Sequence, residues 1–252
     1  ITKIMTLLVA VENSTMDEKV TFTETGVRNV TADSSNIGTK VGEVLTMEEC
    51  LYALIIQSAN DVAAQIAEHI GGTEQAFIDM MNQRASEIGC TNTHFANSSG
   101  LPDDNHYSSA RDMALIFREG LKNETFRTVV GTPDYIIQPT NMNSQQRILH
   151  THHPMFAPES GFYYEGCIGG KTGTAEKLPR GNGDYLLSFI GYAPQENPEV
   201  VVYVVIDEPN TESQEDSSLV LNLARSIMEE AFPYMNISTI DGQPVVAPEQ
   251  PD

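Results

Sequence analysis

The sequence is short of positive charge. Lys and Arg together number 14 against 35 Asp and Glu, which gives a formal net charge of -21 at pH 7. Nucleic-acid backbones are bound by clustered Lys and Arg, and a chain with this charge balance repels them. We therefore expect no nucleic-acid partner and interpret the excess of acidic side chains as a solvated surface.

Cysteine is also scarce. The chain has 3 cysteines, Cys50, Cys90 and Cys167, an odd number whose spacing fits no zinc motif. We expect each to be a small buried apolar side chain. Three of the histidines stand close together without an acidic or cysteine residue beside them: His150, His152 and His153. The sequence therefore predicts no metal site.

Long apolar runs are missing. No run reaches the roughly 20 residues that a transmembrane helix needs. The sequence also shows no initiator Met, no signal peptide and no lipidation signal. With 252 residues it can bury one substantial core, as a single domain or two interleaved subdomains. We expect it to be a piece of a longer protein.

Helical periodicity dominates the first half of the chain. Ile4, Leu7, Leu8 and Val11 fall on one face of a helix that has Lys3 in its first turn. A capping-box pattern at 46–49 begins a second helix, which breaks at 58–60. Further helices are expected at about 61–70, before Gly89 and from Ser109 to Gly120. Residues 90–107 read as a long ordered loop, and 131–160 as irregular with one short hairpin.

The last third changes to strand patterns. Phe162–Ile168, Leu186–Tyr192 and Val200–Ile206 read as strands, and the third is apolar on both faces, which predicts a central position. A closing helix is marked by four apolar residues at helical spacing: Leu219, Leu223, Ile227 and Ala231. From Ser238 the proline-rich, acidic composition predicts a disordered tail.

A glycine-rich stretch, residues 169–174, follows the first of these strand patterns. Lys171 and Thr172 offer a charge and a hydroxyl to an anion, and the glycines let a ligand approach the backbone. A nucleotide-binding P-loop would need glycine where Glu165 stands and a helix after Thr172, and the sequence has neither. A plain glycine-rich turn is the structural alternative.

Two other places suit the same chemistry. Lys3 lies at the start of an apolar helix, where burial would lower its pKa and make its neutral amine a usable base. Ser58 and Asn60 sit at the break between two helices and can hydrogen-bond inward. Taken singly, each has an ordinary reading, as a solvated lysine or as capping residues.

In this order and spacing, three segments resemble the motifs of the active-site serine penicillin-recognising enzymes. Ile1-Thr2-Lys3, Ser58-Ala59-Asn60 and Lys171-Thr172-Gly173 stand where that family has Ser-x-x-Lys, Ser-x-Asn and Lys-Thr-Gly. The resemblance implies a nucleophilic serine directly before Ile1. Residues 1 to about 173 resemble a low-molecular-weight D-alanyl-D-alanine carboxypeptidase, through the stretches 1–6, 57–63, 90–95, 100–103 and 106–107.

After Thr172 the resemblance shifts to the transpeptidase domain of a class B penicillin-binding protein, carried by 173–177, 188–194 and 205–209. A fusion gene and an assembly artefact both remain open as origins of this mosaic. The resemblance implies an α/β (α+β) fold, with an antiparallel sheet flanked by helices and a mainly helical subdomain. The catalytic domain would span 1–237, with its helical part at about 46–122 and its sheet part at about 161–232, and 238–252 would form the tail.

The resemblance also implies roles for the first group of residues. Lys3 would be the general base toward the serine, three residues away on the same helical face. Ser58 would relay a proton to the leaving D-alanine, and Asn60 would hold the substrate's peptide amide. Asp61, His94 and His106 are expected to be structural.

The second group would bind the substrate. Lys171, Thr172 and Gly173 would receive the terminal carboxylate of an acyl-D-Ala-D-Ala stem peptide. The backbone N–H of Thr174 would form the oxyanion hole together with that of the serine.

The implied function is a serine-type D-Ala-D-Ala carboxypeptidase that acts on peptidoglycan stem peptides, binds β-lactams and needs no cofactor. It would be exported to the outer face of the cytoplasmic membrane, with any membrane association through segments outside this sequence. The alternatives are a D,D-transpeptidase, a β-lactamase of the same fold, and a non-catalytic binding module. Because the family's early strands would precede Ile1, we expect the piece to expose a sheet edge, to have reduced stability and to form no acyl-enzyme.

Overall fold

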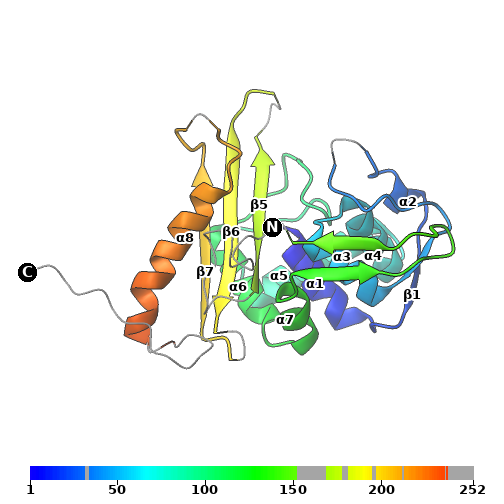
Figure 1. The fold of residues 1–252 in the computed structure, drawn as a ribbon, viewed down its shortest axis with the longest axis horizontal. Coiled ribbons are helices and arrows are strands. Elements are labelled where there is room, and N and C mark those ends of the chain that lie inside the picture. Colours follow the sequence, from blue (N-terminus) through cyan, green and yellow to red (C-terminus); the bar gives the residue numbers. More distant parts are fainter. Residues whose placement is uncertain are drawn as a thin grey trace, which may run out of the picture. The chain divides into compact units, whose positions relative to one another are not determined.

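The chain folds into two compact units, Ile1–His152 and His153–Asp252, which are considered separately below (Figure 1). The structure is a computed structural model that describes residues 1–31, 34–151, 169–177, 181–194, 197–211, 213–235 and 237. Several predictions fall outside these residues: the strand at 162–168, the tail at 238–252, and the environments of His152, His153 and Cys167. The predicted catalytic domain of 1–237 and its subdivision stay predictions.

The first unit is built around one central helix. α1 packs against α3, α4, α5, α6 and α7. Its residues from Lys3 to Ala10 are all buried, so it is apolar on nearly every side, as a helix enclosed by other helices must be. The helices of this unit are α1 (Lys3–Asn13), α2 (Glu24–Val27), α3 (Met47–Ile56), α4 (Asn60–Gly71), α5 (Glu74–Ile88), α6 (Ala110–Gly120) and α7 (Glu124–Val130).

Local capping signals set the helix ends. The predicted capping box is present: Thr46 accepts from the Glu49 backbone N–H, and the Glu49 side chain accepts from the Thr46 backbone N–H. Gly72 and Gly89 follow α4 and α5 in the left-handed conformation, with φ of 72° and 89°. These helices are confirmed. Helices α2 and α7 were not predicted, because 4 and 7 residues are too short to show a period.

Two small antiparallel hairpins complete this unit. β1 (Lys19–Thr21) pairs with β2 (Val44–Thr46), and β3 (Asp134–Ile137) pairs with β4 (Arg147–His150). The second is the hairpin predicted within 131–160. Fully buried Glu43, beside β2, accepts hydrogen bonds from Arg147 Nη2 at 2.8 Å and Thr140 Oγ1 at 2.6 Å. This buried ion pair joins the two hairpins.

The second unit is an antiparallel sheet covered by a helix. Strands β5 (Gly169–Glu176), β6 (Tyr185–Ala193) and β7 (Val200–Asp207) pair in the order β5-β6-β7. Helix α8 (Ser218–Ala231) lies along the sheet and is followed by the short 3-10 helix η3 (Phe232–Met235) (Figure 1). Their shared core comprises Leu187, Phe189, Ala193, Val204, Val220, Leu221, Ala224, Met228, Phe232 and Ile237. The predicted combination of helices and antiparallel sheet is confirmed.

One prediction about this sheet is wrong: strand β7 is not central in the described sheet, where β6 is the middle strand. The alternative of a plain glycine-rich turn at 169–174 is excluded, because these residues are the first part of β5. Gly169 is required there by packing, because a Cβ on it would lie 1.8 Å from Cε1 of Tyr192.

The predicted closing helix is confirmed as α8, and two of the four residues that marked it, Leu219 and Ala231, pack against the core. Leu223 and Ile227 are 45% and 41% exposed. The buried stripe is Val220, Leu221, Ala224 and Met228. Both stripes have helical spacing, so periodicity alone cannot choose between them. The buried one continues into Phe232, which packs in the same core.

Candidate active site

The side chain of Lys3 is held inside the first unit by two oxygen acceptors. It is the first residue of α1, and only 6% of it is exposed. Its Nζ donates to Oδ1 of Asn60 at 2.6 Å and to the backbone carbonyl oxygen of Ser99 at 2.7 Å. The structure thus brings together two of the predicted site residues, which are 57 positions apart in the chain.

These two acceptors fix the position of the amine nitrogen, because each lies at hydrogen-bond distance from Nζ. Asn60 is fixed in turn, because its Nδ2 donates to Oγ of Ser34 at 2.9 Å while Oδ1 faces Lys3.

Ser58 lies where the sequence predicted, between α3 and α4, but in an unusual backbone conformation. Its φ is 55°, in the left-handed region that residues other than glycine seldom occupy. The following residue, Ala59, donates its N–H to the Ala53 carbonyl at 3.2 Å, which closes the end of α3. In the described part of the chain the Ser58 hydroxyl makes no hydrogen bond to Lys3 or Asn60. Its role as a proton relay stays a prediction.

Asp61 supports this break from inside. It is fully buried at the start of α4 and accepts from Oγ1 of Thr39 at 2.9 Å and from the Val62 backbone N–H at 2.9 Å. Burial raises the pKa of this carboxyl group, and the hydrogen bonds from Thr39 oppose that rise. The contacts are those of a structural residue, as expected.

The sequence reasoning missed the acceptor at Ser99. The residue belongs to the predicted loop of 90–107, in which His94 and Tyr107 form an isolated β-bridge. The group that binds Lys3 is a backbone carbonyl, which every residue carries. The Asn, Ser and Gly content of the segment could predict a loop but not which of its carbonyls would be used.

His106 contacts Thr2, the residue that precedes Lys3. Its Nδ1 accepts from the Ala96 backbone N–H at 3.2 Å. The proton of the neutral ring is therefore on Nε2, which donates to Oγ1 of Thr2 at 2.7 Å. Burial lowers the pKa of His106 to about 4, so the ring is neutral at pH 7.

This shift predicts a pH dependence of stability. The folded state binds the His106 proton only near pH 4, whereas the unfolded chain binds it near 6.5. The stabilisation is therefore present above pH 6.5 and is lost as pH falls toward 4. As pH falls from 7 to 4.5, we expect the free energy of unfolding to decrease by roughly 1 to 2 kcal/mol less in His106→Gln than in the parent. This figure is reduced because the ring is partly exposed.

Urea unfolding at pH 7 and at pH 4.5 measures that effect. His94→Gln is the matched control, because its ring is exposed and binds the Asn105 carbonyl at 2.7 Å. The N-terminal amino group, Asp103 and His94 also act on the pKa of His106. Equal pH slopes in the parent and in His106→Gln would contradict the assignment of a neutral ring.

In the second unit, Lys171 lies within strand β5. Its side chain is 8% exposed, and burial lowers its pKa to about 8. Alternate strand residues point to opposite faces, so Lys171 and Gly173 share one face and Thr172 and Thr174 share the other. The register places Thr172 opposite Phe189, whose side chain packs in the core with α8.

The peptide between Gly173 and Thr174 has a defined direction. Oγ of Ser188, on β6, donates to the Gly173 carbonyl oxygen at 3.3 Å. The C=O and N–H of a trans peptide point in opposite directions. The Thr174 N–H therefore points away from β6, out of the edge that β5 forms in the described sheet.

The two groups of predicted residues thus lie in different units. Lys3, Ser58 and Asn60 belong to the first and Lys171, Thr172, Gly173 and Thr174 to the second. The expectation that they converge on one cleft stays a prediction.

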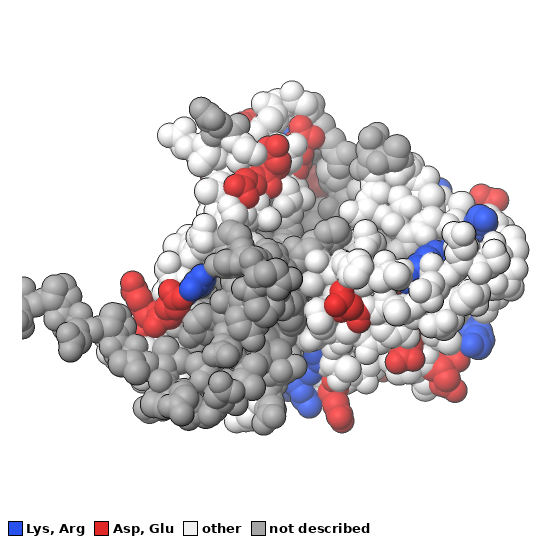
Figure 2. Space-filling view, in the orientation of Figure 1, with Lys and Arg blue, Asp and Glu red and all other residues white. Residues whose placement is uncertain are grey.

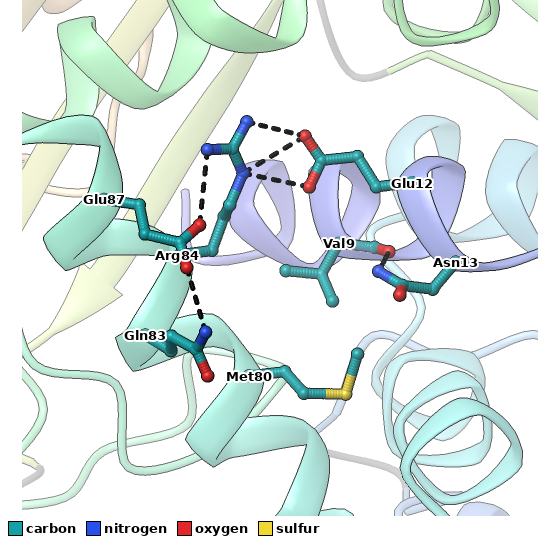
Figure 3. Close-up of a pocket in the computed structure, with 7 residues that line it drawn as sticks. All are labelled: Val9, Glu12, Asn13, Met80, Gln83, Arg84 and Glu87. Atoms are coloured by element: carbon teal, nitrogen blue, oxygen red, sulfur yellow. Dashed lines mark hydrogen bonds and ion pairs between the residues drawn. The ribbon is translucent and has the colours of Figure 1, made fainter.

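A hollow elsewhere on the first unit has a different character. It measures about 370 Å³ and lies between α1 and α5, lined by Val9, Glu12, Asn13, Met80, Gln83, Arg84 and Glu87 (Figure 3). Arg84 at its rim already binds Glu12 at 2.8 Å and Glu119 at 3.1 Å. Its charge is neutralised within the protein, so we assign this hollow a structural role.

The described surface and side chains show few other site features. On the face seen in Figure 2, acidic and basic side chains are scattered rather than gathered by sign. No group of three or more His, Cys, Asp or Glu is placed for metal binding within the described ranges. His150 instead pairs with Asp134 at 2.7 Å across β3 and β4. Cys50 is buried as expected, whereas Cys90 is only half-buried. The helices in the described segments are also too short or too polar to cross a membrane.

Comparisons with known proteins agree with the motif pattern. The sequence model of the D-alanyl-D-alanine carboxypeptidase family, peptidase S11, matches residues 1–208. The chain is 35% identical over 178 residues to D-alanyl-D-alanine carboxypeptidase DacF of Bacillus subtilis, covering 68% of this chain and 43% of DacF. It is 34% identical over 182 residues to a D-alanyl-D-alanine carboxypeptidase of Streptomyces sp. strain K15, covering 69% of this chain and 62% of that protein.

Among solved structures, the Streptomyces K15 DD-transpeptidase matches with a TM-score of 0.71 and 28% identity, covering 90% of this chain and 86% of that one. The family match continues past Lys171-Thr172-Gly173 into the segment that resembles a class B protein, and that second resemblance stays a prediction. The chain spans about half the length of the curated relatives: 43% of one and 62% of the other. With a family match over most of its length, the chain belongs to the D-alanyl-D-alanine carboxypeptidase family.

Proposed function

We propose that this protein is a serine-type D-Ala-D-Ala carboxypeptidase that acts on peptidoglycan stem peptides through an acyl-serine intermediate. The observation that carries the proposal is the buried amine of Lys3, held by Asn60 Oδ1 at 2.6 Å and the Ser99 carbonyl at 2.7 Å. A buried amine held in place by two fixed acceptors is suited to act as a general base in its neutral form. The family's serine, expected directly before Ile1, is the nucleophile.

The first half-reaction forms the acyl-enzyme. The serine oxygen attacks the carbonyl carbon of the penultimate D-alanine while its proton passes to Nζ of Lys3. Asn60 holds the substrate's peptide amide. The N–H of Thr174 and that of the serine stabilise the negative oxygen of the tetrahedral intermediate. Ser58 then relays a proton to the leaving nitrogen, the C–N bond breaks, and D-alanine departs.

The substrate's terminal carboxylate is bound at β5. The ammonium of Lys171 supplies the charge, and it is largely protonated at neutral pH because its pKa is about 8. Lys171 and Thr172 project to opposite faces of β5, and we expect both to reach a carboxylate that lies along the edge β5 forms in the described sheet. This placement supports the assignment of Lys171, Thr172, Gly173 and Thr174 to substrate binding.

The acceptor that attacks the acyl-serine in the second half-reaction distinguishes the possible enzymes. In a carboxypeptidase, water attacks the acyl-serine and releases the shortened stem peptide. A D,D-transpeptidase uses an amine of a second stem peptide instead, and the solved K15 structure is titled a DD-transpeptidase. Release of D-alanine together with the shortened, unlinked stem peptide supports a carboxypeptidase. Formation of stem-peptide dimers supports a transpeptidase, and rapid turnover of β-lactam supports a β-lactamase. Because stem peptides lie outside the cytoplasmic membrane, we place the protein's site of action there.

The decisive test compares the 252-residue chain with two extended forms, which carry serine or alanine directly before Ile1. Each is incubated with penicillin and with an acyl-D-Ala-D-Ala peptide, and then analysed by mass spectrometry. We expect a stoichiometric penicillin adduct and D-alanine release only with the added serine. An adduct on the unextended chain would show that another residue is the nucleophile.

The non-catalytic alternative predicts a different outcome. A binding module would retain the peptide in equilibrium dialysis and form no adduct in any of the three forms. A folded serine-extended chain, verified by circular dichroism, that gave this result would overturn the proposed enzymatic function.

A further inference from the structure

The second acceptor of Lys3 sits in a loop that is organised by a single side chain. Oδ1 of Asn97 accepts from the backbone N–H groups of Ser99 at 3.2 Å, Gly100 at 2.7 Å and Leu101 at 3.1 Å. It also lies 3.2 Å from the donating Oγ of Ser99. Nδ2 of Asn97 donates to the Leu101 carbonyl at 2.8 Å. The chain from 97 to 101 is therefore wrapped around one amide group.

This loop is fastened along the start of α1. Two successive carbonyls, of Ser98 and Ser99, accept from Oγ1 of Thr6 at 2.6 Å and from Nζ of Lys3 at 2.7 Å. Thr6 and Lys3 are neighbours on one face of the helix, three residues apart. Two successive carbonyls of the loop are therefore bound by two neighbouring side chains on one face of α1.

The approach of the loop depends on a left-handed residue. Gly100 has φ of 86°, and a Cβ on it would lie 2.9 Å from Oγ1 of Thr2. Glycine adopts this conformation without strain but has many others available, so hydrogen bonds are needed to select it. Asn97 supplies a bond to the N–H of Gly100 itself and to those of the residues on either side.

We propose that Asn97 is a positioning residue, which holds the Ser99 carbonyl against Nζ of Lys3 and thereby fixes the position of this amine. This inference rests on the proposed function of Lys3 as the base. Asn97 acts through Ser99 and does not touch the substrate. A misplacement of about 1 Å in a catalytic group can lower the rate roughly a hundredfold. A small shift of this loop is therefore expected to change the rate through Lys3.

The test compares three variants of the serine-extended chain. In Asn97→Ala all hydrogen bonds of the side chain are lost. Asn97→Asp keeps the oxygen that accepts the three N–H groups and loses only the bond to the Leu101 carbonyl. Asn82→Ala is the matched control, since Asn82 holds the same long loop further upstream, through the N–H and C=O of Phe95 at 2.8 Å and 2.9 Å.

Two quantities are measured on each folded variant: the rate of acylation by a fluorescent penicillin, on the plateau of its pH profile, and the 13C resonance of the Ser99 carbonyl. We expect Asn97→Ala to lower the rate roughly tenfold to a hundredfold and to shift this resonance. Asn97→Asp should recover most of the rate. Asn82→Ala should melt at a lower temperature with the parent's rate and resonance.

The possible failures are distinguishable. Parent-like acylation in Asn97→Ala, or an equal loss in Asn82→Ala, would overturn the positioning role. A Ser99 resonance unchanged in Asn97→Ala would overturn it as well. The serine-extended parent could fail to be acylated while the Ser99 resonance shifts only in the Asn97 variants. That result would contradict the proposed function but would still support the role of Asn97 in positioning Ser99.

Discussion

Replacing Lys3 by methionine in the serine-extended chain is expected to lower the rate of acylation by penicillin roughly 10²- to 10⁴-fold, the range attributed to general-base catalysis. Methionine keeps the apolar stem within the core of α1 but removes the base. It also leaves the Asn60 Oδ1 and the Ser99 carbonyl without their donor. Two unpaired acceptors cost about 1 to 3 kcal/mol each where they stay dry.

The loss of stability has to be separated from the loss of the base. Asn82→Ala is the control, because it removes two hydrogen bonds between α5 and the same long loop, at Phe95, and leaves the Ser98 and Ser99 carbonyls bound to α1. We expect it to lower the melting temperature and to leave acylation within a few-fold of the parent. Acylation by folded Lys3→Met at a rate near that of Asn82→Ala would exclude Lys3 as the base.

Replacing Lys171 by methionine is expected to stabilise the second unit while it removes carboxylate binding. The folded-state pKa of Lys171 is about 8, against 10.5 for the unfolded chain. The folded state therefore disfavours the charged form, and its stability falls as pH drops from 10.5 toward 8. At pH 7 this burial costs on the order of 2 to 3 kcal/mol, which methionine would restore.

Hydrogen exchange of the β6 amides at pH 7 and at pH 9.5 measures this gain. The gain should be large at pH 7 and smaller at pH 9.5, where the parent's lysine is mostly neutral. Lys177→Met is the control: this lysine binds Asp207 at 3.0 Å, and its side chain is 36% exposed. An equal or greater gain in the control would show that Lys171 is not held at a cost in stability.

The combination of higher stability and lost binding would identify Lys171 as a residue kept for function. Buried charges that no core requires are typical of binding sites, where activity and stability compete. A Lys171→Met protein that is less stable than its parent would instead assign the ammonium a structural role in the sheet.

Much of the first unit follows from short-range signals in the sequence. The Thr46 capping box, the glycines after α4 and α5, and the apolar spacing of α1 act within one or two helical turns. Such signals can be read without knowledge of any partner. The strands of the second unit and the buried face of α8 are harder to predict from the sequence. Two apolar stripes on α8 have the same helical spacing. Only the sheet, which packs on one of them, makes the choice.

The features of the site also fall into two groups, those that the sequence determined and those that the tertiary structure decided. The sequence by itself determined the identity and order of Lys3, Ser58, Asn60 and Lys171, because side-chain chemistry and spacing are written in it. Only the tertiary structure decided that Lys3 meets Asn60 and the Ser99 carbonyl, and that Asn97 holds that carbonyl in place. The physical reason is that a backbone carbonyl has no residue identity. Its use depends on contacts between segments about a hundred residues apart, which the local pattern does not encode.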